Sequence, residues 1–345
     1  MTEIFDMKKI TIMLIGMLVL AGVGESAFDN KPGIRAMGMG QAYVSIAEGS
    51  SAMFWNPAGL GNYCSSRFIG ELELMYAKKY LGIDEDNLSD WYVGYVMPLG
   101  EIGSIGIGDL LFTSSKYKEN TGVISYGKNL GDISCGVSIK VMSVMYEENE
   151  YTRLDPLFNA NGYSKTKVGI DIGIIYRMNE ELRVGASVEN ANKPNMTLGN
   201  VSGEELPMII RIGSSYRIGN FTPAIDVSYR DRNINGKKDV NVYGGVEYIV
   251  GQSSSGTGQA FSSIGQTSCL SEVEQTSGVE QASRIEQNSR LSDLIIRAGA
   301  NLDEVSLGAS YSFISGMKID YAFIYPFAAI KGILGSHRFG LTWQL

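Results

Sequence analysis

Several residue types that carry common chemistry are scarce in this chain of 345 residues. It has a single histidine, His337, which excludes any metal or catalytic site that needs two imidazoles. Its three cysteines, Cys64, Cys135 and Cys269, are too far apart for a CxxC metal or redox motif. We also find no nucleophile–base pair, P-loop or zinc motif. The sequence therefore predicts neither an enzyme nor a cofactor or metal site.

Charge and long apolar runs are scarce as well. The chain has 29 Lys and Arg against 37 Asp and Glu, a formal net charge of -8, and no basic stripe that could follow nucleic-acid phosphates. Beyond the N-terminus no segment reaches 18 consecutive apolar residues, and the mean hydropathy is -0.01. These values exclude a nucleic-acid partner and a bundle of membrane helices. They leave a membrane β-barrel open, because its strands are apolar on only one face.

Residues 1–26 have the pattern of a secretory signal peptide. Met7-Lys8-Lys9 is a short basic start, an apolar run follows from Ile10 to Val23, and Gly24 and Ser26 are small exit residues. The run is shorter than the roughly 20 residues that a membrane-spanning helix needs. An uncleaved anchor and a buried helix are the alternatives. The sequence thus predicts export, with a mature chain that begins near Ala27.

From about residue 67 onward, apolar and polar residues alternate with a period of two, which is typical of β-strands. Val168 and Ile170 share one face of such a run, while Gly169 and Asp171 share the other. Fourteen runs follow this pattern: 67–81, 90–98, 101–113, 116–129, 132–147, 164–178, 180–191, 206–218, 220–231, 238–251, 292–301, 304–314, 317–327 and 336–345. Short turns alternate with longer polar loops between them, as in outer-membrane barrels. The predicted fold is all-β, a 14-stranded antiparallel transmembrane β-barrel over residues 67–345, with a soluble β-sandwich as the alternative.

The polar face of these runs carries charges of both signs in nearly equal number. Such a balance predicts a paired network inside the barrel and argues against a strongly charge-selective pore. The solvated face of a soluble sheet is the alternative interpretation. The predicted members are Glu71, Glu73, Lys140, Asp171, Arg183, Arg211, Asp226, Arg230, Glu247, Arg297, Asp320 and Arg338, together with Glu189.

Residues 27–66, which precede the first strand, contain two blocks rich in small and apolar residues. Residues 33–44 read GIRAMGMGQAYV, and residues 50–61 read SSAMFWNPAGLG. The first block is not a dinucleotide-binding loop, because Tyr43 occupies the third glycine position and no strand precedes it. Small residues permit close packing, so we expect this segment to pack against the barrel wall.

With these blocks, the chain resembles the PorV/PorQ-like outer-membrane proteins, which are related to FadL-type transporters of hydrophobic compounds. The same resemblance extends to residues 242–248 (VYGGVEY), 296–299 (IRAG), 318–322 (KIDYA) and 336–341 (SHRFGL). It implies a fourteen-stranded barrel whose N-terminal segment folds inward as a hatch. The hatch residues it implies are Gly38, Gly40, Trp55, Asn56, Pro57 and Ala58.

Two features depart from that family pattern, and one further motif needs interpretation. The chain ends in Leu345 where such barrels usually end in an aromatic, and residues 252–291 form a polar insertion. We expect the insertion to be flexible and periplasmic, with a weak helix in its second half as the alternative. Residues 231–239 have the spacing of a calcium loop, but Val242 stands where the bidentate Glu belongs, which favours an ordinary polar hairpin.

The sequence therefore predicts a one-domain protein of the outer membrane of a diderm bacterium, surrounded by outer-membrane lipid. Its first predicted function is passive transport of a hydrophobic small molecule, bound near Met37, Met39, Phe54 and Trp55. The alternative, implied by the PorV resemblance, is a component of a type IX-like secretion system that docks exported proteins. The longest external loop, 147–163, carries aromatic and aliphatic residues that suit either function.

Overall fold

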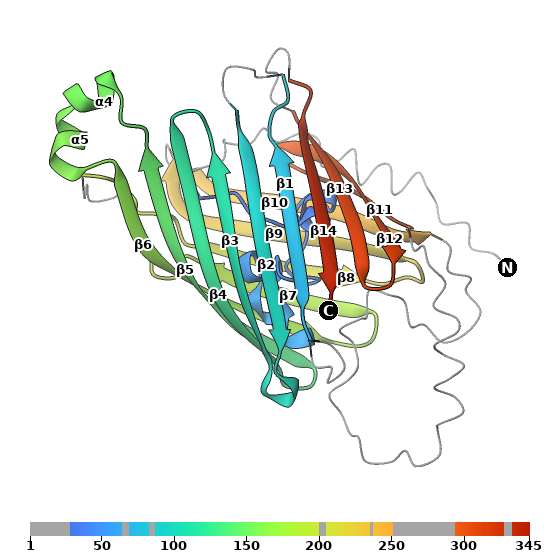
Figure 1. Cartoon of the computed structure of the whole chain (residues 1–345). Coiled ribbons are helices and arrows are strands. Elements are labelled where there is room, and N and C mark those ends of the chain that lie inside the picture. Colours follow the sequence, from blue (N-terminus) through green and yellow to red (C-terminus); the bar gives the residue numbers. More distant parts are fainter. Residues whose placement is uncertain are drawn as a thin grey trace, which may run out of the picture.

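Fourteen antiparallel strands close into a barrel (Figure 1). The computed structural model describes residues 28–63, 69–82, 87–199, 205–234, 237–250, 294–327 and 333–345. Each strand pairs with the next along the chain, and β1 (Glu71–Lys78) pairs with β14 (Ser336–Gln344) to complete the closure. The strands between them are β2 (Ser89–Pro98), β3 (Ser104–Thr113), β4 (Tyr117–Asn129), β5 (Ile133–Tyr146), β6 (Ser164–Arg177), β7 (Leu182–Glu189), β8 (Ile209–Tyr216), β9 (Phe221–Ile234), β10 (Lys237–Val250), β11 (Leu294–Asn301), β12 (Glu304–Ile314) and β13 (Met317–Pro326).

This architecture confirms the predicted fold class. Every predicted run coincides with a strand, and the ends differ by four residues at most. No helix in the described part of the chain is long and apolar enough to cross a membrane. The predicted signal peptide at 1–26 and the predicted insertion at 252–291 lie outside the described residues.

The alternation of residue types places apolar side chains outside the barrel and polar ones inside it. On β4 and β5, Ile124 lies directly across from Ile139, and both are exposed on the outer face. The adjacent residues on the two strands, Ser125 and Ser138, also lie opposite each other, but they face inward, are buried and share a hydrogen bond of 2.6 Å. Because successive residues of a strand point to opposite faces, a shift of one residue along the strand moves the side chain from the apolar exterior to the polar interior. An apolar outer band of this kind is what a bilayer solvates.

The two ends of the barrel differ in the length of their connections. Short turns lie at the end that holds the C-terminus: 99–103, 130–132, 178–181, 217–220 and 315–316. The opposite end has three short connections, 114–116, 235–236 and 302–303, and four longer ones, 79–88, 147–163, 190–208 and 327–335. The connection 147–163 contains two short helices, α4 (Glu150–Leu154) and α5 (Pro156–Asn161). Outer-membrane barrels have short periplasmic turns and long external loops. We therefore take the end that carries α4 and α5 as external.

Residues 28–63, which we name the inner segment, lie inside the barrel (Figure 1). They contain α2 (Ile34–Gly38), α3 (Ala52–Trp55) and the 3-10 helix η1 (Pro57–Asn62). Nearly all of their side chains are buried, and they form one apolar cluster with inward-facing residues such as Tyr92 and Val123. The core of the molecule is thus the contact between the inner segment and the wall.

Glycines on the inner face of the strands allow the backbone of the inner segment to touch the wall. A Cβ atom at Gly245 would lie 2.2 Å from the carbonyl oxygen of Met39, and one at Gly136 would lie 2.2 Å from the carbonyl carbon of Pro57. Other wall glycines that face the inner segment are Gly94, Gly106, Gly108, Gly127, Gly173, Gly185, Gly299, Gly308 and Gly340. The 42 glycines of the chain therefore serve in part to admit this segment.

We predict that Gly136→Ala destabilises the barrel and loosens η1. The new methyl group would overlap the Pro57 backbone, and overpacking of this kind costs about 1–3 kcal/mol. Gly122→Ala on the neighbouring strand is the matched control, because its nearest neighbour would be Asp109 Oδ1 at 3.7 Å. Thermal unfolding of the detergent-solubilised protein, followed by gel mobility, measures the effect. Equal midpoints for the two variants would contradict the prediction.

Candidate functional site

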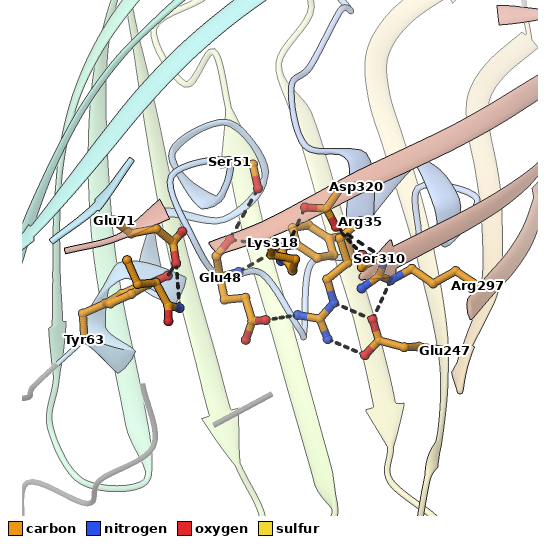
Figure 2. A network of polar contacts seen from close by, with 12 residues as sticks. Arg35, Glu48, Ser51, Tyr63, Glu71, Glu247, Arg297, Ser310, Lys318 and Asp320 are labelled. Carbon is orange, nitrogen blue, oxygen red and sulfur yellow. Dashed lines mark hydrogen bonds and ion pairs between the residues drawn. The ribbon is translucent and has the colours of Figure 1, made fainter. Parts of the chain in front are cut away.

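The contact between α2 and the wall is centred on one carboxylate that binds two guanidinium groups (Figure 2). Arg35 on α2 donates from Nε and Nη2 to the two oxygens of Glu247 on β10, at 2.8 Å each. Arg297 on β11 lies directly across from Glu247 and donates to it from Nε at 2.6 Å. All three side chains are largely buried. The carboxylate thus joins the inner segment to two strands with strong charge-assisted hydrogen bonds.

The same network continues on both sides of this centre (Figure 2). On one side, Arg35 also pairs with Glu48 of the inner segment. On the other, Arg297 lies 3.9 Å from Asp320, which is 3.6 Å from Lys318. The six residues alternate in sign, with three acids and three bases, so the network is neutral, and its two ends, Glu48 and Lys318, are each about one-third exposed. Burial acts to lower the pKa of Arg35, but Glu247 and Glu48 together raise it well above its usual value.

A second wall carboxylate, Asp226 on β9, binds the backbone of the inner segment. Its Oδ2 accepts hydrogen bonds from the amides of Tyr43 and Val44, at 2.8 and 2.9 Å. Arg211 on β8 lies 3.7 Å from this oxygen, and its guanidinium stacks over the ring of Trp55 at 5.2 Å. Backbone groups that would otherwise be unpaired in the interior are satisfied here by the wall.

The first described residues of the inner segment are each bound to a different strand. The amide of Phe28 donates to Glu119 on β4 at 3.0 Å, and Asp29 pairs with Arg230 on β9. Lys31 pairs with Glu189 on β7. Burial lowers the pKa of Lys31 to about 8, against the opposing attraction of Glu189. These contacts fix the start of the segment across the width of the barrel.

The Asn-Pro-Ala motif anchors the turn between α3 and η1. Asn56 is fully buried, and its Nδ2 donates to the carbonyl oxygens of Val44 at 2.8 Å and of Ile174 at 3.1 Å. Its Oδ1 accepts from the amide of Ala58 at 3.2 Å and so caps η1, with Pro57 in the first helical position. One amide side chain thus joins two parts of the inner segment to β6.

The predicted lumen charges are brought together, mostly as pairs. Besides the pairs above, Lys140 lies 2.8 Å from Asp171, and Arg338 lies 3.5 Å from Asp90. Two acids bind hydroxyl groups of the inner segment: Glu73 accepts from Ser50 at 2.6 Å, and Glu71 from Tyr63 at 3.1 Å. Arg183 lies half-buried on β7. The predicted network therefore has a role the pattern did not reveal, since much of it binds the inner segment.

Sequence reasoning missed the partners that the inner segment supplies to this network. Lys31, Arg35 and Glu48 were not predicted as site residues, although each makes an ion pair. One signal was available, because Arg35 is the only charged residue in the apolar block 33–44. A lone charge in a segment expected to be buried indicates a buried partner.

The four residues predicted to bind a hydrophobic ligand are all buried in the apolar cluster: Met37, Met39, Phe54 and Trp55. Trp55 donates to the carbonyl oxygen of Pro32 at 2.8 Å. Met37 also borders a small polar pocket near the external end, which Lys79, Glu304 and Arg338 line with it. These four positions remain a prediction for ligand binding.

Among the residues that the structure describes, no group of three or more His, Cys, Asp or Glu is placed to hold a metal ion. Asp231, the first residue of the possible calcium loop, pairs with Lys193. Residues 235–236 of that loop and the side chains of residues 232–238 lie outside the described part of the chain.

Residues 50–335 match the family model of the type IX secretion system membrane protein PorP/SprF. No curated protein matches the chain. The narrower resemblance to PorV and PorQ stays a prediction.

Solved structures of FadL-type transporters share the fold. The toluene transporter TbuX of Ralstonia pickettii matches with a TM-score of 0.57 and 12% identity over 91% of this chain and 98% of that one. The toluene transporter TodX of Pseudomonas putida matches with a TM-score of 0.53 and 11% identity over 90% of this chain and 96% of that one. A FadL homologue of Pseudomonas aeruginosa matches with a TM-score of 0.51 and 11% identity over 91% of this chain and 98% of that one. At these identities the likeness establishes the fold alone.

We predict that Glu247→Gln strongly destabilises the contact between the inner segment and the barrel wall. Loss of one partner from a buried ion pair costs about 3–5 kcal/mol, and here two buried guanidinium groups lose their shared carboxylate. Glu48→Gln is the control, because Glu48 is about one-third exposed and an exposed pair contributes about 1 kcal/mol or less. Thermal unfolding and protease cleavage within residues 28–63 report the outcome. A Glu247→Gln protein as stable as the control would refute the importance of this centre.

We also predict that Asn56→Asp is more harmful than its similar shape suggests. The change replaces the Nδ2 donor by an oxygen that faces the carbonyl oxygens of Val44 and Ile174. A buried acceptor left without a donor costs about 1–3 kcal/mol, and a charged one costs more. Asn62→Asp, at the half-buried end of η1, should leave the unfolding midpoint nearly unchanged. Similar midpoints for both variants would count against the anchoring role of Asn56.

Proposed function

The chain belongs to the PorP/SprF family of type IX secretion system membrane proteins, and on this premise we propose that it docks protein partners of such a system at the outer membrane. In this proposal the barrel acts as a sealed platform, and its lumen is not the route of passage. The observation that carries the proposal is the filling of the lumen by the inner segment, which buried ion pairs bind to the wall.

The energetics of the inner segment support a static platform. If the segment moved aside, Arg35 would leave Glu247, and the amides of Tyr43 and Val44 would leave Asp226. Each buried group left unpaired costs about 1–3 kcal/mol, and more if it is charged. A transport cycle that opens the lumen would have to overcome several such costs at once. A docking role needs no such movement.

The resemblance of residues 33–44 and 50–61 to PorV and PorQ supports a narrower proposal, namely that the docked proteins are exported ones. We further propose that the protein is not an enzyme. Its one histidine, His337, lies 2.8 Å from the hydroxyl of Tyr321 on the next strand, within the aromatic surface of β13 and β14.

Passive transport of a hydrophobic molecule is the second candidate function. It is favoured by the FadL-type fold, which this chain shares with the toluene transporters TbuX and TodX over nearly the whole of those chains. In that case the cluster of Met37, Met39, Phe54 and Trp55 would receive the molecule. An apolar surface between hatch and wall suits such a ligand.

Deletion of the gene in its native host separates the two functions. Under the docking proposal, proteins that normally leave the cell accumulate in the periplasm, and the wild-type gene restores their export. Uptake of toluene by intact cells is expected to stay unchanged, and the purified barrel in planar bilayers is expected to show no current steps. Normal export combined with slower toluene uptake would refute docking and favour transport.

A further inference from the structure

The outer face of β3 carries an acid among apolar residues. Gly106 of this strand faces Met53 of the inner segment, so the alternate residues face outward. The outward residues are Ile105, Ile107, Asp109, Leu111 and Thr113. Asp109 lies across from Val93 on β2 and from Gly122 on β4, and the three strands lie side by side (Figure 1). A carboxylate therefore faces the apolar band that the bilayer solvates.

Aromatic residues on the neighbouring strands indicate the depth of Asp109 in the membrane. Trp91 on β2 lies across from Leu111, one outward position nearer the external end. Tyr126 on β4 lies across from Ile105, two outward positions nearer the periplasmic end. At about 3.3 Å per residue, Asp109 is about 7 Å along the strand from the level of Trp91 and about 13 Å from the level of Tyr126. Tryptophan and tyrosine mark the two interfaces of a membrane barrel, so Asp109 lies between the interfaces.

The carboxylate of Asp109 has a single hydrogen-bond donor among the described residues. Asn120 on β4 donates from Nδ2 to both of its oxygens, at 3.0 Å to Oδ1 and 2.9 Å to Oδ2. An ionised carboxylate has about four acceptor sites, so one shared donor leaves most of them open. Water fills such sites at a solvated surface, but it is excluded from the hydrocarbon region.

The bases on this side of the barrel are too far along the strands to pair with Asp109. Lys118 is four residues from Gly122 along β4, which is about 13 Å, and Lys128 is six residues away in the other direction, about 20 Å. Lys116, in the connection before β4, lies farther out than Lys118. All three are beyond the levels of Trp91 and Tyr126, where lysine side chains extend to the head groups. The outward positions of β2 carry no charge.

The space beside the carboxylate is open. A Cβ atom at Gly122 would meet only Asp109 Oδ1, at 3.7 Å. The surrounding outward side chains are apolar and exposed: Val93, Ile107 and Ile124. Small residues let membrane-embedded elements approach each other closely, and a polar centre within an apolar rim is typical of interface centres.

The chemistry of the partner follows from the charge and its depth. A charge on the lipid-facing surface destabilises a barrel, and charged side chains within a membrane are for this reason paired. A lipid phosphate repels the carboxylate, and lipid amines lie at the level of the head groups. A second copy of this chain offers no Lys or Arg on the outward positions that the structure describes between the two aromatic levels. The complementary base must then come from another membrane protein.

We propose that the outer face of β2, β3 and β4 binds a second outer-membrane protein, which presents an arginine or lysine to Asp109 within the bilayer. The inference rests on the proposed docking function and names a surface and a class of partner for it. The base donates to the open acceptor sites of Asp109, Asn120 orients the carboxylate, and the space at Gly122 admits the side chain of the partner.

The test uses the full chain in cells of the native host. A photoreactive benzoylphenylalanine in place of Val93 should form an adduct with one outer-membrane protein on irradiation. Mass spectrometry should place that adduct beside a lysine or arginine in a membrane-spanning segment. Adducts only with lipid, adducts only with a second copy of this chain, or no adduct at all would each overturn the inference.

Asp109→Asn keeps the size of the side chain and removes its charge. The yield of adduct and the amount of partner that co-purifies in mild detergent should both fall about tenfold or more. Asp132→Asn, in an exposed periplasmic turn, is the matched control and should leave both unchanged. The unfolding midpoint of Asp109→Asn should stay the same or rise, because a charge leaves the lipid-facing surface. A clearly lower midpoint would assign Asp109 a structural role instead and overturn the inference.

Two further variants test the contact itself. Gly122→Leu fills the open space with a side chain that lipid solvates, so it should reduce the adduct about as much although the carboxylate remains. Asp109→Arg should abolish association, and exchange of the identified base of the partner for Asp should restore it in that background. Normal association of both variants with the unaltered partner would refute the contact.

These failures are distinguishable from failure of the proposed function. If gene deletion blocks export but the Asp109→Asn strain exports normally and retains its adduct, this face is not the docking surface and the docking function stands. If deletion leaves export intact, the proposed function itself fails, whatever the adducts show.

Discussion

A closed barrel of fourteen strands encloses more space than its own inward side chains can fill. The interior must therefore be wet or occupied, and in this protein the inner segment occupies it. Its backbone touches the wall where the wall is glycine, as at Gly136 and Gly245, and its polar groups meet wall charges elsewhere. The glycine content and the paired charges of the lumen both follow from this one requirement.

Buried ion pairs are weak evidence for stability, because the desolvation of two charges offsets much of their attraction. Their effect here is better understood as positional. Glu247 can satisfy both Arg35 and Arg297 only when α2 lies against β10 and β11, and Asp226 can bind the amides of Tyr43 and Val44 only in the same arrangement. An apolar interface would tolerate a slide along the wall, whereas these pairs penalise any other placement.

The strands could be predicted from the sequence because their pattern is local. Alternation at Val168, Gly169 and Ile170 reports burial on two faces without knowledge of any partner strand. The members of the lumen network followed from the same alternation. Their pairing did not, because Arg35 and Glu247 are 212 positions apart and meet only after the barrel has closed. Nor were the helices α4 and α5 predicted, although Asn149 with Thr152, and Asp155 before Pro156, are recognisable helix starts.

The charges inside the barrel and those at its external end differ in burial and in pairing. Inside, acids and bases alternate and cancel, from Glu48 through Arg35, Glu247, Arg297 and Asp320 to Lys318, and the network holds the inner segment. At the external end, acids of the connection that carries α4 and α5 share the surface with lysines of the neighbouring strands and connection. The exposed acids are Glu147, Glu148, Glu150 and Asp155, and the exposed lysines are Lys116, Lys118 and Lys167. Solvated charges act on an approaching molecule only over about one Debye length, roughly 8 Å at physiological salt. The buried charges therefore fix the position of the inner segment, whereas the solvated charges of both signs at the external end are left to the surrounding medium.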